Sequence, residues 1–468
     1  MHDQVESLKW CQKYITYFGG NPNNVTIMGQ SAGAMSCFMH YISPLSKGLF
    51  HKVITLSGSA TTPFLHNDRE SSIYAKSFAK SFGIDVNEPV EKIVHELQKL
   101  SVTKIVKRTL LFKNWDSSFP LPWKPIVDKN AKRPFMPFSF EEAIQAGNFD
   151  KNIPILAGVT SEEGLIVTAP FHKSQRRWNL FFRHWYKWAP QFLFNREIDL
   201  ISETDISVVK EIFDHYFSEE GNKKKDAGFI LKEKETNNDD DDITASTLFI
   251  QKSIDQEQGV IPSYSEANLK KLEEIVSTAW FHAPLQNDLE QLVRGGVSVY
   301  TFKFCYQGPF SMLDVFRLSL PKIGLNLMGH YLGLNMYKKE LGACHTDDLM
   351  YIFPMKLLPK PPDNQTDIEI SNFLTQHISN FSLCGDPTPT KDEESEETSF
   401  QWPRMKSCDN DMVIIQKDGS IVIKKDEDIE RNNSWTQLFK RVSFPLSNCP
   451  IETLYDKIAE SRDRTCCL

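Results

Sequence analysis

The sequence predicts an α/β fold in which a mostly parallel central sheet is covered by helices. Short apolar runs of strand length recur along the 468 residues, and segments with helical periodicity lie between them. Strands that alternate with helices in this way are typical of parallel sheets. Hydrophobic residues make up 40% of the chain and aromatic residues 12%, which is enough for a sizeable core.

A helix, a turn, a strand and a second helix are expected near the start of the chain. Apolar side chains recur near a 3.6-residue period over residues 4–18, which predicts an amphipathic helix. The letters GGNPNN end this helix. Residues 25–28 form an apolar run of strand length, and the second helix is expected over about 32–41, before SPLSKG.

Three further strands are predicted downstream. They cover residues 53–56, 153–157 and 297–304, and the first two end in turns. Two segments, 232–244 and 391–399, are rich in acidic residues. We interpret them as surface loops rather than cation sites, because neither has the ligand spacing of an EF-hand. The sequence contains no internal repeat and no linker that would separate domains.

Charge and composition exclude several classes of function. The 53 basic and 61 acidic residues give a net charge of −8, whereas nucleic-acid binding requires a basic face. No apolar run approaches the roughly 18 residues of a membrane span, and the N-terminus lacks the pattern of a signal peptide. The nine cysteines are too few for a disulfide scaffold, and none has zinc-like spacing. We therefore expect no nucleic-acid partner, no membrane span and no metal site.

A serine motif stands at the first predicted strand-to-helix turn. Residues 29–33 read GQSAG and match G-x-S-x-G, which is informative in this setting. Such a turn is strained and lifts the serine Oγ clear of the sheet, while the glycines let strand and helix pass closely. The N–H of Ala32, at the start of the helix, can face an oxyanion. By itself the motif fits a reactive Ser31 and a glycine-rich turn with a solvated serine equally well.

Candidate partners for this serine lie downstream. A serine hydroxyl is a poor nucleophile until a base takes its proton, and in folds with this motif an acid and then a histidine follow the serine. Glu162 and Glu163 stand in the turn after the strand at 153–157, and His345 stands in a short polar turn before an apolar run. Taken singly, each fits an ordinary surface or packed side chain. Their order and their positions at strand ends favour a catalytic triad.

With these residues in place, the chain resembles the type-B carboxylesterases, the family of carboxylesterases, cholinesterases and insect juvenile hormone esterases. The matching segments are FGGNPNNVTIMGQSAGAMS, SPLSKGLFHKVITLSGSA, ILAGVTSEEG and GACHTDDLMYIF, with shorter matches at WKPIVD and GDPTP. The resemblance extends from about residue 3 to residue 439. It implies an α/β-hydrolase fold, with one domain over residues 1–445 and a tail over 446–468.

The resemblance assigns roles to the residues of the motifs. Ser31 would be the nucleophile, and His345 would be the general base and acid. Glu163 would be the acid of the triad rather than Glu162, because it directly precedes the glycine of the family motif. Ala32 would give one oxyanion N–H. No metal or cofactor is implied.

Other matching positions concern the surroundings of the triad and the substrate. Ser57 matches a serine that supports the acid, and Phe64 falls near the position that lines the acyl pocket. Many members have glutamate where this chain has Gln30. The letters GQSAG, the pair Asp3-Gln4 and the spacing G-x-x-H-x-x-D resemble the set of the insect juvenile hormone esterases. This suggests a lipophilic ester as the small-molecule substrate, such as juvenile hormone or a xenobiotic.

The expected function is therefore that of a serine hydrolase, which cleaves carboxylic esters through an acyl-enzyme on Ser31. The same triad would also serve thioester or amide hydrolysis. In the family, a longer segment precedes the serine turn and carries the first strands, a disulfide and a glycine-rich oxyanion loop. We expect this chain to be an N-terminally truncated form without those strands. Loss of the loop favours the alternative, a non-catalytic relative that acts in binding or adhesion.

Glycosylation sequons bear on location. N-x-[ST] occurs at Asn24, and the candidates for glycosylation are Asn364, Asn380 and Asn432. Such sites matter only in the secretory pathway, which conflicts with the missing signal peptide. We expect a full-length form to enter that pathway, and the location of this chain stays open.

Overall fold

The computed structural model describes residues 1–63, 68–109, 123–196, 201–218, 253, 260–309, 311–312, 341–354, 364–389, 400–406 and 411–442. Contacts divide the chain into two compact units. The first comprises Met1–Thr62, Asp128–Gln175 and Ser265–Thr436, and the second comprises Pro63–Val127, Arg176–Tyr264 and Gln437–Leu468. The domain boundary expected near residue 445 lies outside the described residues. A single domain over residues 1–445 stays a prediction.

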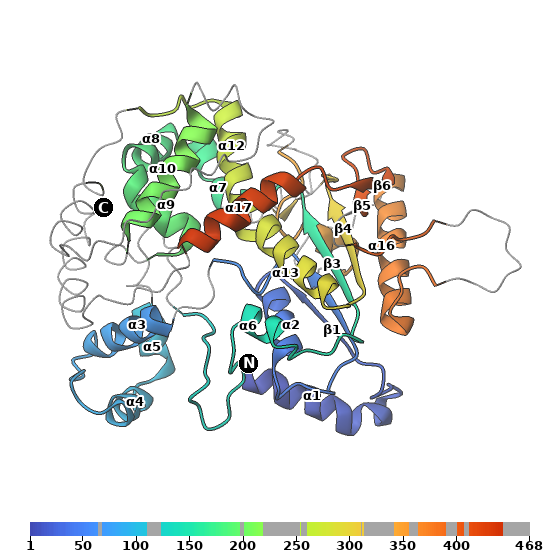
Figure 1. The fold of residues 1–468 in the computed structure, drawn as a ribbon, viewed down its shortest axis with the longest axis horizontal. Coiled ribbons are helices and arrows are strands. Elements are labelled where there is room, and N and C mark those ends of the chain that lie inside the picture. The colour runs from blue at the N-terminus through green and yellow to red at the C-terminus, as the bar shows by residue number, and fades with distance from the viewer. Residues whose placement is uncertain are drawn as a thin grey trace, which may run out of the picture. The chain divides into compact units, whose positions relative to one another are not determined.

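A six-stranded sheet forms the centre of the first unit (Figure 1). Its strands follow the order of the sequence, and β1 to β5 pair in parallel while β6 runs antiparallel to β5. The strands are β1 Thr26–Gln30, β2 Lys52–Leu56, β3 Ile155–Thr160, β4 Val299–Phe304, β5 Asp411–Ile415 and β6 Ile421–Lys425. Parallel neighbours require crossover connections, and helices lie on both faces of the sheet.

Each of the four predicted strands overlaps an observed one, whereas the sequence analysis did not predict β5 and β6. These two strands form a hairpin, in which Gly419 adopts a left-handed φ of 86°. Its N–H donates to the carbonyl of Gln416 at 2.9 Å. Only part of this hairpin is buried, because the outer strand β6 has three exposed residues.

Helices on the two faces carry the connections (Figure 1). The predicted helix at 4–18 is α1 His2–Tyr14 followed by a 3₁₀ turn, η1 Ile15–Phe18. The predicted helix at 32–41 is α2 Ala32–Ile42. The other described elements of the unit are α6 Phe140–Gln145, α7 Leu165–Thr168, η3 Phe171–Lys173, α12 Glu266–Ser277, the π turn η6 Thr278–His282, α13 Ala283–Arg294, η8 Asp347–Tyr351 and α16 Gln365–Cys384. Figure 1 shows α16 on one side of the sheet and α2 and α13 on the other.

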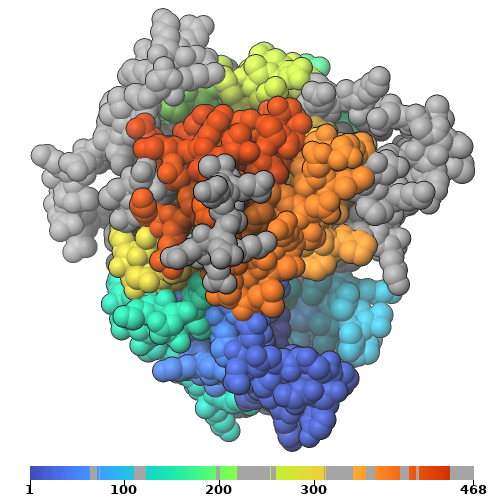
Figure 2. All heavy atoms as spheres, turned by 90° about the vertical axis from the view of Figure 1, so that its right-hand side faces the viewer, coloured from blue at the N-terminus to red at the C-terminus, as the bar shows by residue number. Residues whose placement is uncertain are grey.

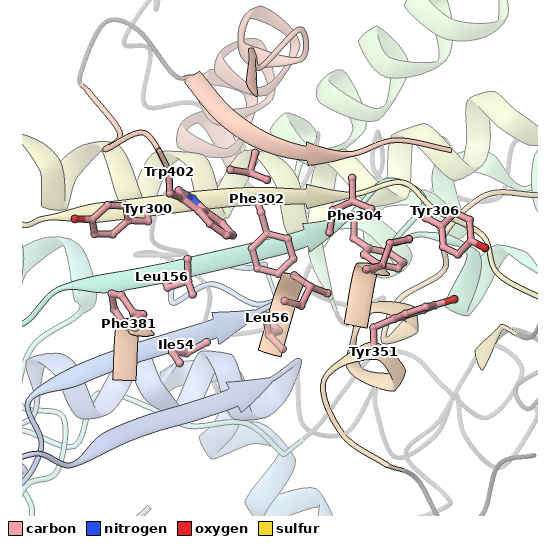
Figure 3. Packing of buried hydrophobic residues seen from close by; sticks show 14 of the residues in the cluster. Ile54, Leu56, Leu156, Tyr300, Phe302, Phe304, Tyr306, Tyr351, Phe381 and Trp402 are labelled. Carbon is pink, nitrogen blue, oxygen red and sulfur yellow. The ribbon is translucent and has the colours of Figure 1, made fainter. Parts of the chain in front are cut away.

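The main apolar core lies between the sheet and α16 (Figure 3). Ile54, Leu156, Phe302 and Phe304 project from neighbouring strands, and Phe381 meets them from α16. Burial of side chains of this size stabilises the fold by about 1.5–3 kcal/mol each. Figure 2 shows the outer surface on this side, where α16 (orange) and the β5–β6 segment (red) lie next to each other.

A glycine of β3 makes room for this core and gives a test of it. A Cβ at Gly158 would lie 2.2 Å from Cζ of Phe302, so the ring occupies the space of the absent side chain. We expect Gly158→Ala to lower the free energy of unfolding by about 1–3 kcal/mol, because overpacking forces the ring out of place. Urea unfolding followed by circular dichroism measures the loss. Adding Phe302→Leu should recover part of the lost stability. A double variant that loses more free energy of unfolding than the two single variants together would contradict this account.

The second unit is helical where it is described. It contains α3 Asp68–Lys80, α4 Val90–Gln98, α5 Val102–Thr109, α8 Gln175–Arg183, α9 Trp185–Phe194 and α10 Glu203–Phe217, and α17 Ile429–Val442 contributes residues to both units. Aromatic rings pack between α8, α9 and α10. The ring centroids of Trp178 and Phe182 lie 4.2 Å apart, and those of Phe182 and Trp185 lie 5.3 Å apart in a stacked arrangement.

Candidate active site

Ser31 occupies the turn between β1 and α2 with a strained backbone. Its φ is 57° and its ψ is −122°, a combination that non-glycine residues rarely adopt and that clusters at functional sites. A Cβ at Gly29 would lie 2.2 Å from the backbone of Gly33, whereas a Cβ at Gly33 would meet nothing within 4 Å. The close passage of strand and helix therefore depends on the first glycine of the motif and not on the second.

A third glycine, which the sequence analysis did not single out, completes the turn. A Cβ at Gly58 would lie 2.5 Å from the carbonyl oxygen of Ser31 and 2.8 Å from Cβ of Ala34. The loop after β2 thus packs directly on the serine turn. The N–H of Ser31 donates to the carbonyl of Leu56 at 2.8 Å, which ties the turn to the end of β2.

Ala32 begins α2, and the side chain of Ser31 gives this helix no cap. The first amide groups of a helix have no carbonyl partner within the helix, and they carry the positive end of its dipole. The position of the Ala32 N–H therefore fits the expected oxyanion donor. Its role stays a prediction.

The predicted acid and histidine form a buried pair. Glu163 follows β3, His345 precedes η8, and Oε2 of Glu163 lies 2.5 Å from Nδ1 of His345. The side chains are 0% and 2% exposed. The other carboxylate oxygen, Oε1, accepts the N–H of Thr160 at 2.7 Å. The structure thus brings together two of the three predicted triad residues, which lie 182 positions apart.

The charge state of this pair follows from its surroundings. Burial alone would raise the pKa of the Glu163 carboxyl, but the charge of His345 and its hydrogen bond outweigh burial and hold that pKa below its usual range. Glu163 is therefore ionised and accepts the Nδ1 proton of His345. In the neutral form of the ring, Nε2 then carries the lone pair, as a general base requires.

Glu162 is directed elsewhere, so the structure pairs the histidine with the glutamate that the resemblance selected. Its Oε2 accepts the N–H of Ala343 at 3.0 Å, and its Oε1 lies 3.9 Å from Nζ of Lys417. A Cβ at Gly342 would lie 2.2 Å from this carboxyl group, and Gly342 has a φ of 102°. The left-handed backbone and this close approach together favour glycine at the start of G-x-x-H-x-x-D.

Gln30 faces the histidine directly. Its Nε2 lies 3.1 Å from Nε2 of His345 and 2.9 Å from Oγ1 of Thr346. Within the described part of the chain, the hydroxyl of Ser31 makes no hydrogen bond. The hydrogen bond between Ser31 and His345 that the triad requires is therefore not formed in this structure. The amide of Gln30 contacts Nε2 of His345 instead.

Ser57 lies at the end of β2 with a φ of 54° and is fully buried. Its hydroxyl is among the groups that lower the pKa of Glu163, although no acceptor or donor meets it at standard hydrogen-bond geometry among the described residues. This placement fits the expected support of the acid. Phe64, the expected acyl-pocket residue, lies outside the described residues, as do the two acidic loops.

Two supporting residues were not found by sequence reasoning. Nε2 of His282 lies 2.9 Å from the carbonyl of Thr160, whose N–H holds Glu163. Burial, with the nearby charge of Lys303, lowers the pKa of His282 to about 4, so its ring is neutral. His282 also lines a cavity of about 50 Å³ between β3, β4 and α13, with room for a few water molecules but with no wall at Ser31.

Asp288 of α13 is the second supporting residue that sequence reasoning missed. It accepts hydrogen bonds from the hydroxyl of Ser59 at 2.6 Å, the N–H of Ala60 at 2.7 Å and the hydroxyl of Thr61 at 2.6 Å. One buried carboxyl group therefore fixes the loop that follows Gly58. No local motif marks this residue in the sequence.

Asp348, the last residue of G-x-x-H-x-x-D, predicts a pH dependence of stability. It is fully buried, and neither carboxyl oxygen meets a partner at standard hydrogen-bond geometry in the described part of the structure. Burial, with the charge of Glu163, raises its pKa from 3.8 to about 7. The unfolded chain therefore loses this proton at lower pH than the folded chain, and the stability contributed by Asp348 falls as pH rises through this window.

Asp348→Asn removes this titration. We expect the wild-type protein to lose stability relative to the variant as pH rises from about 4 to about 7. Urea midpoints measured at several pH values across this range provide the comparison. Parallel curves for the two proteins would contradict the prediction.

The glycosylation candidates differ in exposure. Asn364 is exposed and caps α16, where its side chain accepts the N–H of Asp367. Asn380 is half-buried, and its Nδ2 donates to the carbonyl of Pro387 at 3.0 Å. Asn432 is 2% exposed, and its Nδ2 donates to Oε1 of Gln286. A glycan on Asn432 does not fit the folded structure.

Two searches of the described residues concern metals and membranes. No group of three or more His, Cys, Asp or Glu residues is arranged to hold a metal ion. None of the described helices is both long enough and apolar enough to cross a bilayer.

The chain is similar to several known proteins. A family model described as "Carboxylesterase family" matches residues 1–435. Juvenile hormone esterase of Tribolium castaneum is 25% identical over 457 residues, which cover 95% of this chain and 68% of that protein. Esterase E4 of Myzus persicae is 33% identical over 228 residues, 48% of this chain and 39% of that protein.

The fold resembles a solved structure of juvenile hormone esterase from Manduca sexta with OTFP covalently attached. The TM-score is 0.65 at 21% sequence identity, and the match covers 94% of this chain and 69% of that chain. This likeness, together with the mostly parallel sheet, confirms the predicted α/β-hydrolase fold.

Proposed function

The chain belongs to the carboxylesterase family, and on that premise we propose that it hydrolyses carboxylic esters through an acyl-enzyme on Ser31. The observation that carries the proposal is the buried pair of Glu163 and His345, at 2.5 Å, whose Nε2 is turned toward the residue next to Ser31. An ionised acid, a histidine in the required tautomer and a strained serine turn are the parts that a serine hydrolase needs.

The proposed reaction has two halves. In the first, Ser31 Oγ attacks the ester carbonyl while His345 Nε2 takes its proton, and Glu163 stabilises the imidazolium that forms. The Ala32 N–H donates to the oxyanion. His345 then gives the proton to the departing alcohol. In the second half, His345 takes a proton from water, which attacks the acyl group. The acid is released as the bond to Ser31 Oγ breaks, and His345 returns the proton to Ser31.

For the substrate, we propose a lipophilic ester such as juvenile hormone or a xenobiotic. The support is the sequence GQSAG, with Gln30 before the serine, and the similarity to the juvenile hormone esterases of Tribolium castaneum and Manduca sexta. A non-catalytic binding protein remains the second candidate. It is favoured by one observation, the absence of a hydrogen bond between the Ser31 hydroxyl and His345 in the described structure.

Covalent labelling separates these candidates. The chain is treated with a fluorophosphonate probe, and the label is located by mass spectrometry. We expect label on Ser31 in the wild type and none in Ser31→Ala. Ser434→Ala serves as the matched control, because that serine lies on α17 and its hydroxyl donates only to the Glu430 carbonyl at an exposed site. An unlabelled wild type would favour the binding protein.

A further inference from the structure

In the proposed reaction, Gln30 and Ser31 compete as hydrogen-bond donors for one lone pair, that of Nε2 of His345. The base of the proposed reaction has one acceptor site, Nε2 of His345, because Nδ1 already donates to Glu163. The Gln30 amide lies 3.1 Å from that nitrogen. We propose that Gln30 is a positioning residue that caps Nε2 of His345 in the resting protein, and that it must release this nitrogen before Ser31 is deprotonated. This inference rests on the proposed function.

The hydrogen-bond network fixes the orientation of the amide. With Glu163 ionised, neutral His345 presents a lone pair at Nε2, so the amide nitrogen and not the carbonyl oxygen of Gln30 must face it. The same NH₂ group donates to Oγ1 of Thr346 at 2.9 Å. Both amide hydrogens are thereby used. The opposite orientation would place two acceptors against each other.

The imidazole is held on its remaining sides as well. The ring centroid of Phe281 lies 4.8 Å from that of His345, and the histidine is 2% exposed. Replacing the Gln30 amide by Ser31 Oγ at Nε2 therefore requires the Gln30 side chain to move, while the ring stays in place. Gln30 ends β1 and Ser31 follows it directly, so in the proposed exchange the two donors come from adjacent positions in the chain.

Protonation of His345 disrupts the cap. The proton that leaves Ser31 Oγ forms a bond to Nε2, which then has no lone pair for the Gln30 N–H. The amide must turn away or present its oxygen. The carboxyl groups whose charge acts on His345 are Glu163, after β3, and Asp348, in η8. Both are kept in the variants below, so a change in pH dependence reports on Gln30.

The test compares the rate of Ser31 labelling by a fluorophosphonate probe across pH. Gln30→Leu removes the donor at similar size, and Gln30→Glu replaces it with an acceptor. A donor to Nε2 favours the unprotonated ring, so we expect the acid limb of the Gln30→Leu profile to move up by about one pH unit. Its plateau rate should rise about fivefold, because the lone pair is free. Gln30→Glu should move the limb further in the same direction.

Gln365→Leu is the control, since Gln365 is exposed on α16 and bonds only Glu369. The inference would be overturned if both Gln30 variants kept the wild-type acid limb and were labelled more slowly at every pH. That result would mean that Gln30 only supports the turn. Imidazole nitrogen NMR gives an answer even if no protein is labelled and the proposed function fails. The Nε2 signal of His345, identified by its loss in His345→Asn, should shift in Gln30→Leu, and an unshifted signal would also overturn the cap.

Discussion

Glu163→Gln is expected to lower kcat for ester hydrolysis by about 10⁴-fold, the loss found when a triad acid becomes an amide. The geometry explains why an amide fails here. Oε1 of Glu163 accepts the Thr160 N–H at 2.7 Å, so the glutamine oxygen must stay at that position. Its NH₂ group then faces Nδ1 of His345 and makes Nδ1 an acceptor. The proton moves to Nε2, where the base is needed.

Steady-state kinetics with a chromogenic ester measure this loss. Glu162→Gln is the matched control, because its carboxyl group contacts Ala343 and Lys417 rather than His345. We expect the control to retain most of the activity and the far-ultraviolet circular dichroism of both variants to match the wild type. A Glu163→Gln protein that kept a tenth of the wild-type kcat would contradict the assignment of the acid.

The two glutamates, Glu162 and Glu163, show how much of the candidate site can be predicted from the sequence. Local spacing left both candidates open, and the family motif selected Glu163 because it precedes Gly164. The structure supplies the physical reason. A Cβ at Gly164 would lie 2.5 Å from the carbonyl of Glu273, and the Gly164 N–H donates to Oγ of Ser277 at 2.7 Å. This contact with α12 fixes the turn in which Glu163 is directed toward His345.

The β5–β6 hairpin was missed although the sequence contains its signal. The segment DMVIIQKDGSIVIKK has two runs of Val and Ile around Asp418 and Gly419, a pattern that predicts a hairpin. By contrast, His282 and Asp288 could not be predicted. Their contacts join residues 122 and up to 229 positions apart. They exist only because the fold brings η6 to the end of β3 and α13 to the loop that follows β2. Sequence patterns report local periodicity and carry no such information.

Substitution of the first glycine of the serine motif is the second change with a large expected effect. The two glycines of the motif are not equivalent. A Cβ at Gly29 would lie 2.2 Å from C and O of Gly33 and 2.7 Å from N of Ala34. These are backbone atoms of α2, so relief requires the helix to move away from β1. We expect Gly29→Ala to lower the free energy of unfolding by about 3 kcal/mol. Displacement of Ser31 by about 1 Å should lower kcat/KM by about 10²-fold or more.

Gly33→Ala is the matched variant for stability, since a Cβ there would meet nothing within 4 Å and the residue lies in the first turn of α2. Alanine favours a helix over glycine by up to about 1 kcal/mol, so this variant should be as stable as the wild type or slightly more so. Urea unfolding of the two variants makes the comparison. Equal losses at both positions would show that the motif requires glycine for backbone freedom rather than for the close passage of β1 and α2.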